Sequence, residues 1–276
     1  MPELPEVETV VRSLAKSLTG RVIRDVEVLH KPSVEGSPSK SQFVKGKRVL
    51  SVHRRGKFIR IDLEDSTAMA IHLRMTGWLG VLPTGAKDPR NDPYVRVRYP
   101  LDDGKETMIF RDVRTFGRVW CGTRDIVESM KALARLGPEP LIIKTDEFAE
   151  RLKSRRGRLK PLLLNQEFLA GVGNIYADES LFRAGLHPLA LSTQVKTANA
   201  HALHAAIQEV LAEAINAGGS SVENFLNPDG EPGWFQQKLR AYGREGEKCM
   251  RCDGTIQRIV LGQRGTWFCP KCQKKR

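Results

Sequence analysis

Apolar residues near the N-terminus recur at the spacing of an amphipathic helix. The positions on this face are Val7, Val10, Val11, Leu14 and Leu18. Pro5 is tolerated in the first turn, because its missing N–H would have no partner there, and nearby glutamates suit the positive end of the helix dipole. We therefore predict a helix that opens within MPELPEVETV and ends near Gly20. Pro2 lies outside this helix and is not explained by it.

Residues 21–122 alternate apolar and polar positions with the period of β-strands. Short β-branched runs are separated by turn sequences such as PTGAKDPRNDP and LDDGK. The predicted strands are RVIRDVEVL, KRVLSV, KFIRIDL, MAIHLRM, YVRVRY and TMIFRDV. This pattern predicts an antiparallel β-sandwich or barrel with one helix leading into it.

The periodicity becomes helical after LGPEPL (136–141), a segment that continues neither type of element and marks a domain boundary. The predicted helices are DEFAERLKS, LKPLLLNQEF, NIYADESLFRAG and TANAHALHAAIQEVLAEAINAG. A loop rich in Gly, Pro and Asp, NPDGEPG (227–233), then precedes a C-terminal cysteine block. We predict an α+β chain of three domains, which cover 1–135, 136–240 and 241–276.

The charge of the chain points to a polyanionic partner. Lys and Arg outnumber Asp and Glu by 45 to 32 in 276 residues, which gives a net charge of +13. Nucleic acid is the usual partner of so basic a chain, and a membrane surface is the alternative. No stretch approaches the roughly 20 apolar residues of a spanning helix, and the acidic N-terminus does not resemble a signal peptide. We therefore expect a cytoplasmic protein with no membrane association.

The densest basic run is RLKSRRGRLK (151–160), with six cations in ten residues. By itself this run fits a solvated helix face as well as a phosphate-binding surface. Beside the motifs described below, the phosphate-binding interpretation is favoured.

Four of the five cysteines form two closely spaced pairs. Cys249-x2-Cys252 and Cys269-x2-Cys272 are sixteen residues apart, the spacing of a four-thiolate structural zinc site. An iron–sulfur cluster or a redox dithiol is the alternative. TIQRIVL and TWF read as two strands joined by GQRG, so the metal would clamp a hairpin with Arg264 at its tip, where it can reach a phosphate or a groove. The fifth cysteine, Cys121, reads as a small buried residue without a further role.

The segment LAGVGN (169–174) combines a tight turn with a helix start. Glycines 171 and 173 make the turn, and Asn174 begins the next helix. Such a turn exposes backbone N–H groups at a helix N-terminus, which favours anion binding. With the preceding LKPLLLNQ helix it forms a unit like a helix–turn–helix.

Several longer segments occur together along the chain. They are, in order, MPELPEVET, HRRGKF, HLRMTG, RDVRTFG, GVGNIYADESLFRAGLHP and GQRGTWFCPKC. Through them the chain resembles, nearly end to end, the bacterial formamidopyrimidine-DNA glycosylases, the 8-oxoguanine repair enzymes. The resemblance implies an N-terminal β-sandwich, a helix–two-turn–helix domain and a C-terminal zinc-finger β-hairpin with one structural Zn²⁺. It also implies that damaged double-stranded DNA is held between domains with the damaged base flipped out.

The same resemblance explains Pro2. The initiator methionine is readily removed before proline, which leaves a secondary amine. An α-amine has a pKa of about 8, against about 10.4 for lysine, so it is a usable nucleophile near neutral pH. In the family, the residue matching Pro2 attacks C1′, expels the base and forms a Schiff base, after which β,δ-elimination nicks the strand. Glu3 matches the residue that protonates the deoxyribose ring, and Glu6 matches a supporting carboxylate.

The resemblance assigns further residues. Lys57 matches a lysine that approaches the lesion and its phosphate, and Arg264 matches the finger arginine that binds phosphates beside the lesion and assists the second elimination. Without the resemblance, Lys57 would be a strand lysine on a wet face. Met75, Arg114 and Phe116 match the family residues that fill the gap left by the flipped base. Without the resemblance, Met75 and Phe116 would be interpreted as core residues. Backbone or lesion-side DNA contacts are matched by His72, Arg156, Lys160 and Asn174.

Some positions depart from the usual family pattern. DVRTFG replaces DPRRFG, Asp92 and Tyr94 lie where relatives often carry histidines, and Asn165 replaces an aspartate. These departures put a DNA contact near Asp92 and Tyr94 in doubt.

Two alternative functions are weighed against the purine-lesion enzyme. Endonuclease VIII-type enzymes share the scaffold and act on oxidised pyrimidines, but they typically begin PEGPE and lack the Met/Arg/Phe set. A non-catalytic zinc-finger DNA-binding protein would not need Pro2, Glu3 or Lys57. We expect a monomeric glycosylase and AP lyase.

Overall fold

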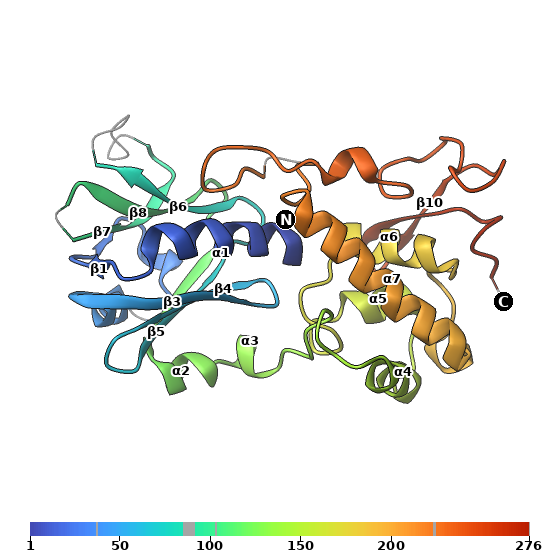
Figure 1. Ribbon diagram of the computed structural model, residues 1–276, viewed down its shortest axis with the longest axis horizontal. Helices are drawn as coiled ribbons and strands as arrows, with labels where there is room; N and C mark the ends of the chain where they lie inside the picture. Colours follow the sequence, from blue (N-terminus) through green and yellow to red (C-terminus); the bar gives the residue numbers. More distant parts are fainter. Residues whose placement is uncertain (37, 85–91, 103, 223–224, 276) are drawn as a thin grey trace. The chain divides into compact units, whose positions relative to one another are not determined.

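The computed structural model describes residues 1–36, 38–84, 92–102, 104–222 and 225–275. They form two compact units (Figure 1). The first unit comprises residues 1–134 and 218–233, and the second comprises residues 135–217 and 234–276.

The first unit opens with helix α1 (Leu4–Leu18), so the helix predicted at the N-terminus is confirmed. Two antiparallel sheets follow, which confirms the predicted sandwich and the α+β class. In strand order, one sheet contains β1 (Val22–Ile23), β3 (Lys47–Arg55), β4 (Phe58–Leu63), β5 (Thr67–His72) and β9 (Arg118–Thr123). The other contains β2 (Glu27–Val28), β7 (Val95–Pro100), β8 (Glu106–Asp112) and β6 (Gly77–Pro83). Short helices α2 (Arg124–Glu128) and α3 (Lys131–Ala134) end this part of the chain.

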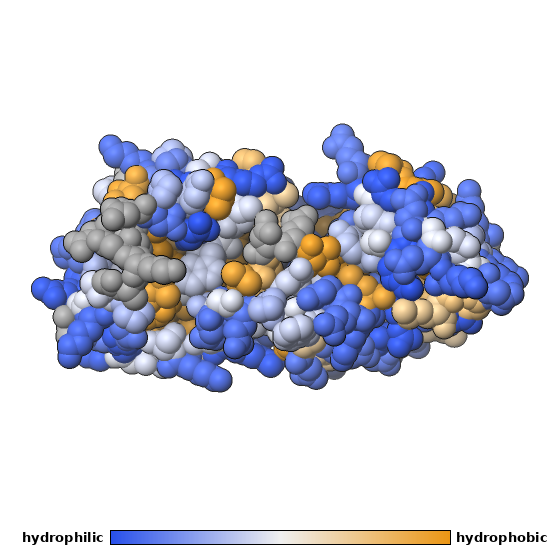
Figure 2. Space-filling view, turned by 90° about the horizontal axis from the view of Figure 1, so that it is seen from above, coloured by the Kyte–Doolittle hydropathy of each residue, from blue (hydrophilic) through white to orange (hydrophobic). Residues whose placement is uncertain are grey.

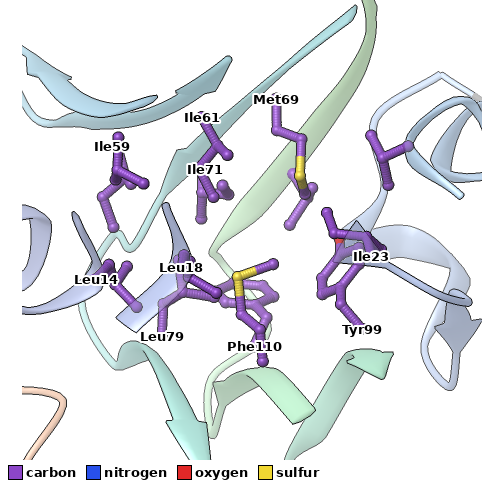
Figure 3. Close-up of a cluster of buried hydrophobic side chains, with 14 of the residues drawn as sticks. Leu14, Leu18, Ile23, Ile59, Ile61, Met69, Ile71, Leu79, Tyr99 and Phe110 are labelled. Atoms are coloured by element: carbon purple, nitrogen blue, oxygen red, sulfur yellow. The ribbon is translucent and has the colours of Figure 1, made fainter. Parts of the chain in front are cut away.

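Apolar side chains from α1 and from both sheets form one core (Figure 3). Helix α1 packs against β3 and β4 of one sheet and β6 of the other, so its apolar face completes the space between them. Leu14 and Leu18 of the helix are fully buried with Ile59 and Ile61 of one sheet and Phe110 of the other. Burying each such side chain contributes about 1.5–3 kcal/mol, so the core dominates the stability of this unit.

Three strand predictions need correction. The single strand expected at 21–29 is two short strands in different sheets, because the chain changes sheets between Ile23 and Glu27. The strand expected to reach residue 75 ends at His72, where a loop with Arg74 at φ +56° begins. Strands β6 and β9 were not predicted, because glycines interrupt their apolar alternation.

The second unit is mainly helical. Its helices are α4 (Thr145–Ser154), α5 (Leu159–Leu164), α6 (Asn174–Ala184) and α7 (Thr197–Asn216), which confirms the predicted helical region. Strands β10 (Gln257–Leu261) and β11 (Arg264–Phe268) form the C-terminal hairpin. Among the described residues, 3-10 helices occupy Ser192–Gln194 and Phe235–Lys238 in this unit, and Lys31–Ser33 and Pro38–Val44 in the first unit. Among the described residues, no helix has the length and apolar character needed to cross a membrane.

Residues 218–233 leave the helical region and join the first unit. Phe225 packs against the sandwich core, and the indole N–H of Trp78 donates to the carbonyl of Asn227 at 3.1 Å. Contacts so distant along the chain leave no periodic signal in the sequence. The division into three domains at 135 and 240 stays a prediction.

Candidate active site and nucleic-acid interface

Two glutamates organise the N-terminal end of α1. Glu3 and Glu6 are 3% and 2% exposed and form the reciprocal arrangement of a capping box. One oxygen of Glu6 accepts the N–H of Glu3 at 2.8 Å, and the other accepts the N–H of Ser220 at 2.7 Å. The Glu6 carboxylate therefore joins the residue after Pro2 to the 218–221 segment. Gly219 has φ +85°, and a Cβ there would lie 2.9 Å from Glu6 Oε1, so this approach requires glycine.

Lys57 lies in the two-residue loop between β3 and β4, not in a strand. Gly56, at φ +57°, permits this tight loop. The Lys57 side chain is only 5% exposed, so it is not a lysine on a wet strand face. Arg54 fixes the loop to α1, because its guanidinium donates to Glu8 at 3.0 Å and to the Gly56 carbonyl at 3.1 Å. The structure thus ties Lys57 to the helix that starts just after Pro2.

The three predicted gap-filling residues lie on two neighbouring loops. The β5–β6 loop carries Met75, and the β8–β9 loop carries Arg114 and Phe116. Strand pairing brings the loops together, because His72 pairs with Arg118 and Gly77 pairs with Asp112.

Asp112 connects these two loops. Its fully buried carboxylate accepts hydrogen bonds from the Thr76 hydroxyl at 2.5 Å and from the Gly117 N–H at 2.7 Å. The Arg114 N–H also donates to the Thr76 hydroxyl at 3.1 Å. The backbones of both loops are therefore held by one set of hydrogen bonds.

The side chains of these loops face solvent. Met75 and Phe116 are 37% and 47% exposed, so neither belongs to the core. The Arg114 guanidinium lies 4.9 Å from the centre of the Phe116 ring. Exposed apolar side chains on a rigid support are suited to insertion into a base stack.

His72 is buried beneath these loops. Its ring packs edge-on against Phe58 with centroids 4.7 Å apart, and its Nδ1 accepts the N–H of Arg74 at 3.0 Å. Burial, with help from the charges of Arg74 and Lys57, lowers the pKa of His72 to about 3. The imidazole is therefore neutral near pH 7 and orients the Met75 loop. A direct DNA contact by His72 stays a prediction.

The departures from the family pattern have local partners. Asp92 accepts from the Arg111 guanidinium at 2.6 Å and from the Tyr94 N–H at 2.8 Å, and the Tyr94 ring lies 5.1 Å from the Arg111 guanidinium carbon. In the second unit, Asn165 Oδ1 accepts the N–H of Glu167 at 2.9 Å. These residues stabilise turns in place of the usual side chains.

Gln166 organises the glycine turn of the second unit. Its amide nitrogen donates to the carbonyls of Leu164 and Val172, and its oxygen accepts the Gly171 N–H at 2.9 Å. Asn174 begins α6 at the end of this turn. Among the described residues, no protein group hydrogen-bonds its buried Oδ1 atom.

The basic run 151–160 does not form one helix face. Helix α4 ends at Ser154, and Arg156 is exposed in the following segment. Lys160, by contrast, is completely buried in α5. Its ammonium lies 2.8 and 2.9 Å from the Asp178 carboxylate oxygens and donates to the Gly265 carbonyl at 2.7 Å. Arg156 is thus available to a polyanion, whereas the Lys160 ammonium is engaged within the protein.

The four paired cysteines converge on one point. Their sulfur atoms all lie within 4.8 Å of one another, with separations such as 3.8 Å for Cys249–Cys272 and 3.6 Å for Cys252–Cys269. A tetrahedron of Zn–S bonds of about 2.3 Å requires sulfurs roughly 3.8 Å apart. Backbone N–H groups of Arg251 and Gly254 point at two of the sulfurs. The donor set fits one structural Zn²⁺ with no position left for water.

The hairpin differs slightly from its prediction. The turn is Gly262–Gln263, with φ of +57° and +61°, and Arg264 is the first residue of β11. Both turn residues have positive φ, as a two-residue hairpin of type I′ requires. Arg264 is exposed beside this turn, so it is available to a phosphate.

Several residues that hold these elements in place were not identified from the sequence. They are Arg54, Asp112, Gln166, Asp178 and Glu179. Asp112 could have been found, because it lies within the RDVRTFG motif. Arg54, Gln166, Asp178 and Glu179 also lie within quoted segments, namely HRRGKF, LKPLLLNQ and GVGNIYADESLFRAGLHP. Their partners are distant in the sequence or are backbone atoms, so the motifs do not show what these side chains hold.

A sandwich that opens with Pro2, Glu3 and helix α1, a helix–two-turn–helix unit and a four-thiolate hairpin define the architecture of a class of DNA glycosylases. Three family models match the chain in that order. They are the formamidopyrimidine-DNA glycosylase N-terminal domain at residues 1–119, the H2TH domain of the same enzymes at 136–225, and the zinc finger found in FPG and IleRS at 246–275. The chain belongs to the formamidopyrimidine-DNA glycosylase family.

Full-length relatives agree with this membership. The formamidopyrimidine-DNA glycosylase of Solibacter usitatus is 45% identical over 277 residues, covering 100% of both chains. That of Pelotomaculum thermopropionicum is 42% identical and covers 99% of each. The crystal structure of the MutM (Fpg) protein from Thermus thermophilus is 40% identical, covers 100% of both chains and has a TM-score of 0.88. Lactococcus lactis Fpg in complex with DNA containing an abasic site is 36% identical, with a TM-score of 0.90 over 99% of this chain and 100% of that one. The suspected family resemblance is confirmed.

Proposed function

We propose that this protein is a bifunctional DNA glycosylase and AP lyase of base excision repair that removes 8-oxoguanine and formamidopyrimidines from double-stranded DNA. The arrangement of Glu3 and Glu6 directly behind Pro2 carries this proposal most strongly. The names of the relatives and a Lactococcus lactis complex with DNA containing Fapy-dG support the substrate class.

The first step uses the N-terminal amine. After removal of Met1, the Pro2 nitrogen attacks C1′ of the damaged nucleotide. Glu3 protonates the O4′ atom of the opening sugar ring, the damaged base leaves with the electrons of its glycosidic bond, and an iminium forms between Pro2 and C1′. Glu6 fixes the Glu3 backbone through the hydrogen bond at 2.8 Å, so the carboxyl group stays beside the amine.

Strand cleavage follows from the iminium. Loss of a C2′ proton allows the 3′ phosphate to leave, and a second elimination at C4′ releases the 5′ phosphate. Lys57 would approach the lesion phosphate during these steps. Arg264 would bind phosphates beside the lesion and stabilise their charge during the second elimination.

The remaining residues would bind and deform the duplex. Met75, Arg114 and Phe116 would fill the space vacated by the flipped base, which partly offsets the few kcal/mol lost on unstacking. Arg156 and Asn174 would contact the DNA backbone. One Zn²⁺ on the four thiolates would hold the hairpin and supply no catalytic chemistry, because the site has no open position. We also infer that the monomer works in the cytoplasm at the nucleoid, where its substrate lies.

The endonuclease VIII-type alternative predicts the opposite lesion preference. The exposed Met75 and Phe116, held on loops joined through Asp112, favour the purine-lesion branch. A non-catalytic DNA-binding protein would have no use for the buried carboxylates behind Pro2.

A cleavage assay separates these functions. The purified protein is incubated with duplexes that contain 8-oxoguanine or an oxidised pyrimidine, and the strands are resolved on a denaturing gel. We expect faster nicking at 8-oxoguanine, and Glu3→Gln should abolish nicking while DNA binding remains. Faster cleavage at the pyrimidine would favour the endonuclease VIII-type enzyme, and binding without cleavage would favour the non-catalytic protein.

A further inference from the structure

The C-terminal hairpin is attached to α6 through buried polar groups. Asp178 and Glu179 are consecutive on this helix and only 1% and 4% exposed. Glu179 accepts backbone N–H groups of Arg240, Ala241 and Tyr242, at 2.8–3.1 Å, from the segment that leads into the zinc module. Asp178 instead accepts the Trp267 N–H of β11 at 3.1 Å. One carboxylate therefore holds the entry to the module and the other holds its last strand.

Lys160 completes the second attachment. Its ammonium binds Asp178 and also donates to the Gly265 carbonyl at 2.7 Å. The ion pair thus binds the β11 backbone at residues 265 and 267, immediately after Arg264. A buried ion pair contributes little net stability, because desolvation offsets its attraction, so it is better explained by the geometry that it fixes.

The Trp267 side chain packs on the same strand. The indole ring lies 4.5 Å from the Tyr242 ring and 5.5 Å from the Arg258 guanidinium carbon. It also covers Gly265, where a Cβ would lie 2.7 Å from the indole. The strand that begins with Arg264 is therefore held at its backbone by Lys160 and Asp178 and through the side chain of Trp267 by its packing against Tyr242 and Arg258.

We propose that Lys160 and Asp178 are positioning residues for Arg264, and that Lys160 acts on DNA through this arginine and not by contacting a phosphate itself. The inference rests on the proposed role of Arg264 at the phosphates beside the lesion. Lys160 has no exposed surface, so a direct contact would require the ion pair to open.

Removing Asp178 distinguishes the two roles by the sign of the effect. If Lys160 contacts DNA directly, Asp178→Asn releases a cation, and affinity should stay the same or rise. If the pair positions Arg264, Asp178→Asn should weaken binding despite the less negative protein. Asp146→Asn is the matched control, since it makes the same chemical change at a carboxylate that is 87% exposed.

The experiment measures Kd against salt concentration for a duplex carrying a tetrahydrofuran abasic analogue. Arg264→Ala should lower the slope of log K against log salt by about 0.9, the value for one phosphate contact. We expect Asp178→Asn and Lys160→Met each to lower the slope by a similar amount with one zinc retained per chain. Neither should lower it further when combined with Arg264→Ala, and Asp146→Asn should leave it unchanged.

Unchanged or tighter binding by Asp178→Asn, or additive losses in the combined variants, would overturn the positioning role. An unchanged slope for Arg264→Ala would instead contradict the proposed phosphate contact, while 8-oxoguanine cleavage would still test the enzyme's function separately. If a single variant loses zinc, Lys160→Met combined with Asp178→Leu removes both charges without leaving one buried alone. This combined variant should keep zinc and show the same loss of slope, and an unchanged slope would again overturn the proposal.

Discussion

The sandwich and the zinc module hold their functional residues in different ways. In the sandwich, twenty-five of the described residues form one buried apolar cluster, and strand register places the active loops above it. The corresponding cluster at the zinc module has five buried residues, of which Cys249 and Cys269 are metal ligands. A large core supports Met75 and Phe116, whereas Arg264 depends on a metal and a few buried polar contacts. Loss of a metal ligand or polar contact should therefore unfold only the zinc module. Loss of a core side chain should instead lower the stability of the whole sandwich unit.

Zinc removal should produce the largest difference between the two regions. Structural zinc contributes on the order of 10–16 kcal/mol in small zinc-finger modules, so chelation or Cys269→Ser should unfold the hairpin locally. DNA affinity and strand cleavage should both fall, while hydrogen exchange in the sandwich stays slow. Added zinc should restore the stripped wild-type protein but not Cys269→Ser. Unchanged DNA binding by metal-free protein would show that the hairpin does not grip DNA.

Leu14→Ala tests the sandwich side of the comparison. The side chain is fully buried between α1 and the sheets, so its truncation should cost about 2–5 kcal/mol of unfolding free energy. Denaturant unfolding followed by circular dichroism measures this loss, and zinc content should remain at one ion per chain. Loss of zinc in the folded variant would mean that the two regions are not independent.

His72 should make the sandwich sensitive to acid. Its pKa is lowered from 6.5 to about 3 on folding, because burial disfavours the charged imidazole. The unfolded state therefore binds the proton first, and stability should be lost as pH falls below about 6.5, by about 2 kcal/mol between pH 7 and pH 5. His72→Asn should reduce this slope. An identical pH slope in His72→Asn would contradict the burial of a neutral imidazole.

Phe116→Ala should have a smaller effect that appears only in catalysis. The exposed ring is proposed to fill the base stack, and on that proposal excision of 8-oxoguanine should slow about tenfold, which corresponds to about 1.4 kcal/mol of barrier. Cleavage at a preformed abasic site should change less, because there is no base to extrude. Measuring both rates on the same duplex sequence separates the two steps, and equal losses would indicate a folding defect instead.

Local signals account for what the sequence predicted well. Helix α1 follows from a periodic apolar face with Glu3 at the N-cap and Glu6 in the first turn, and the thiolate cluster follows from the spacing of four cysteines. The burial of Cys121 follows from its apolar surroundings, and burial raises the pKa of its thiol to about 12. In each case the determining residues lie close together in the chain.

Long-range partners account for what the sequence did not show. Residues 218–233 join the sandwich through contacts with Glu6 and Trp78, far earlier in the chain. In the sequence Lys160 is one of many cations in a basic run, and only the fold encloses it between Asp178 and Gly265. On the face seen in Figure 2 hydrophilic side chains predominate. A polar side chain is therefore expected at the surface by default, and the complete burial of Lys160 comes from the fold.

The N-terminal amine is the central claim of this account, and covalent trapping tests it most directly. Borohydride added during reaction with an 8-oxoguanine duplex should reduce the iminium to a stable protein–DNA adduct, and peptide mapping should place it on Pro2. A protein with a short N-terminal extension should bind the duplex and give no adduct. An undiminished adduct from the extended protein, or an adduct that maps to Lys57, would contradict the account.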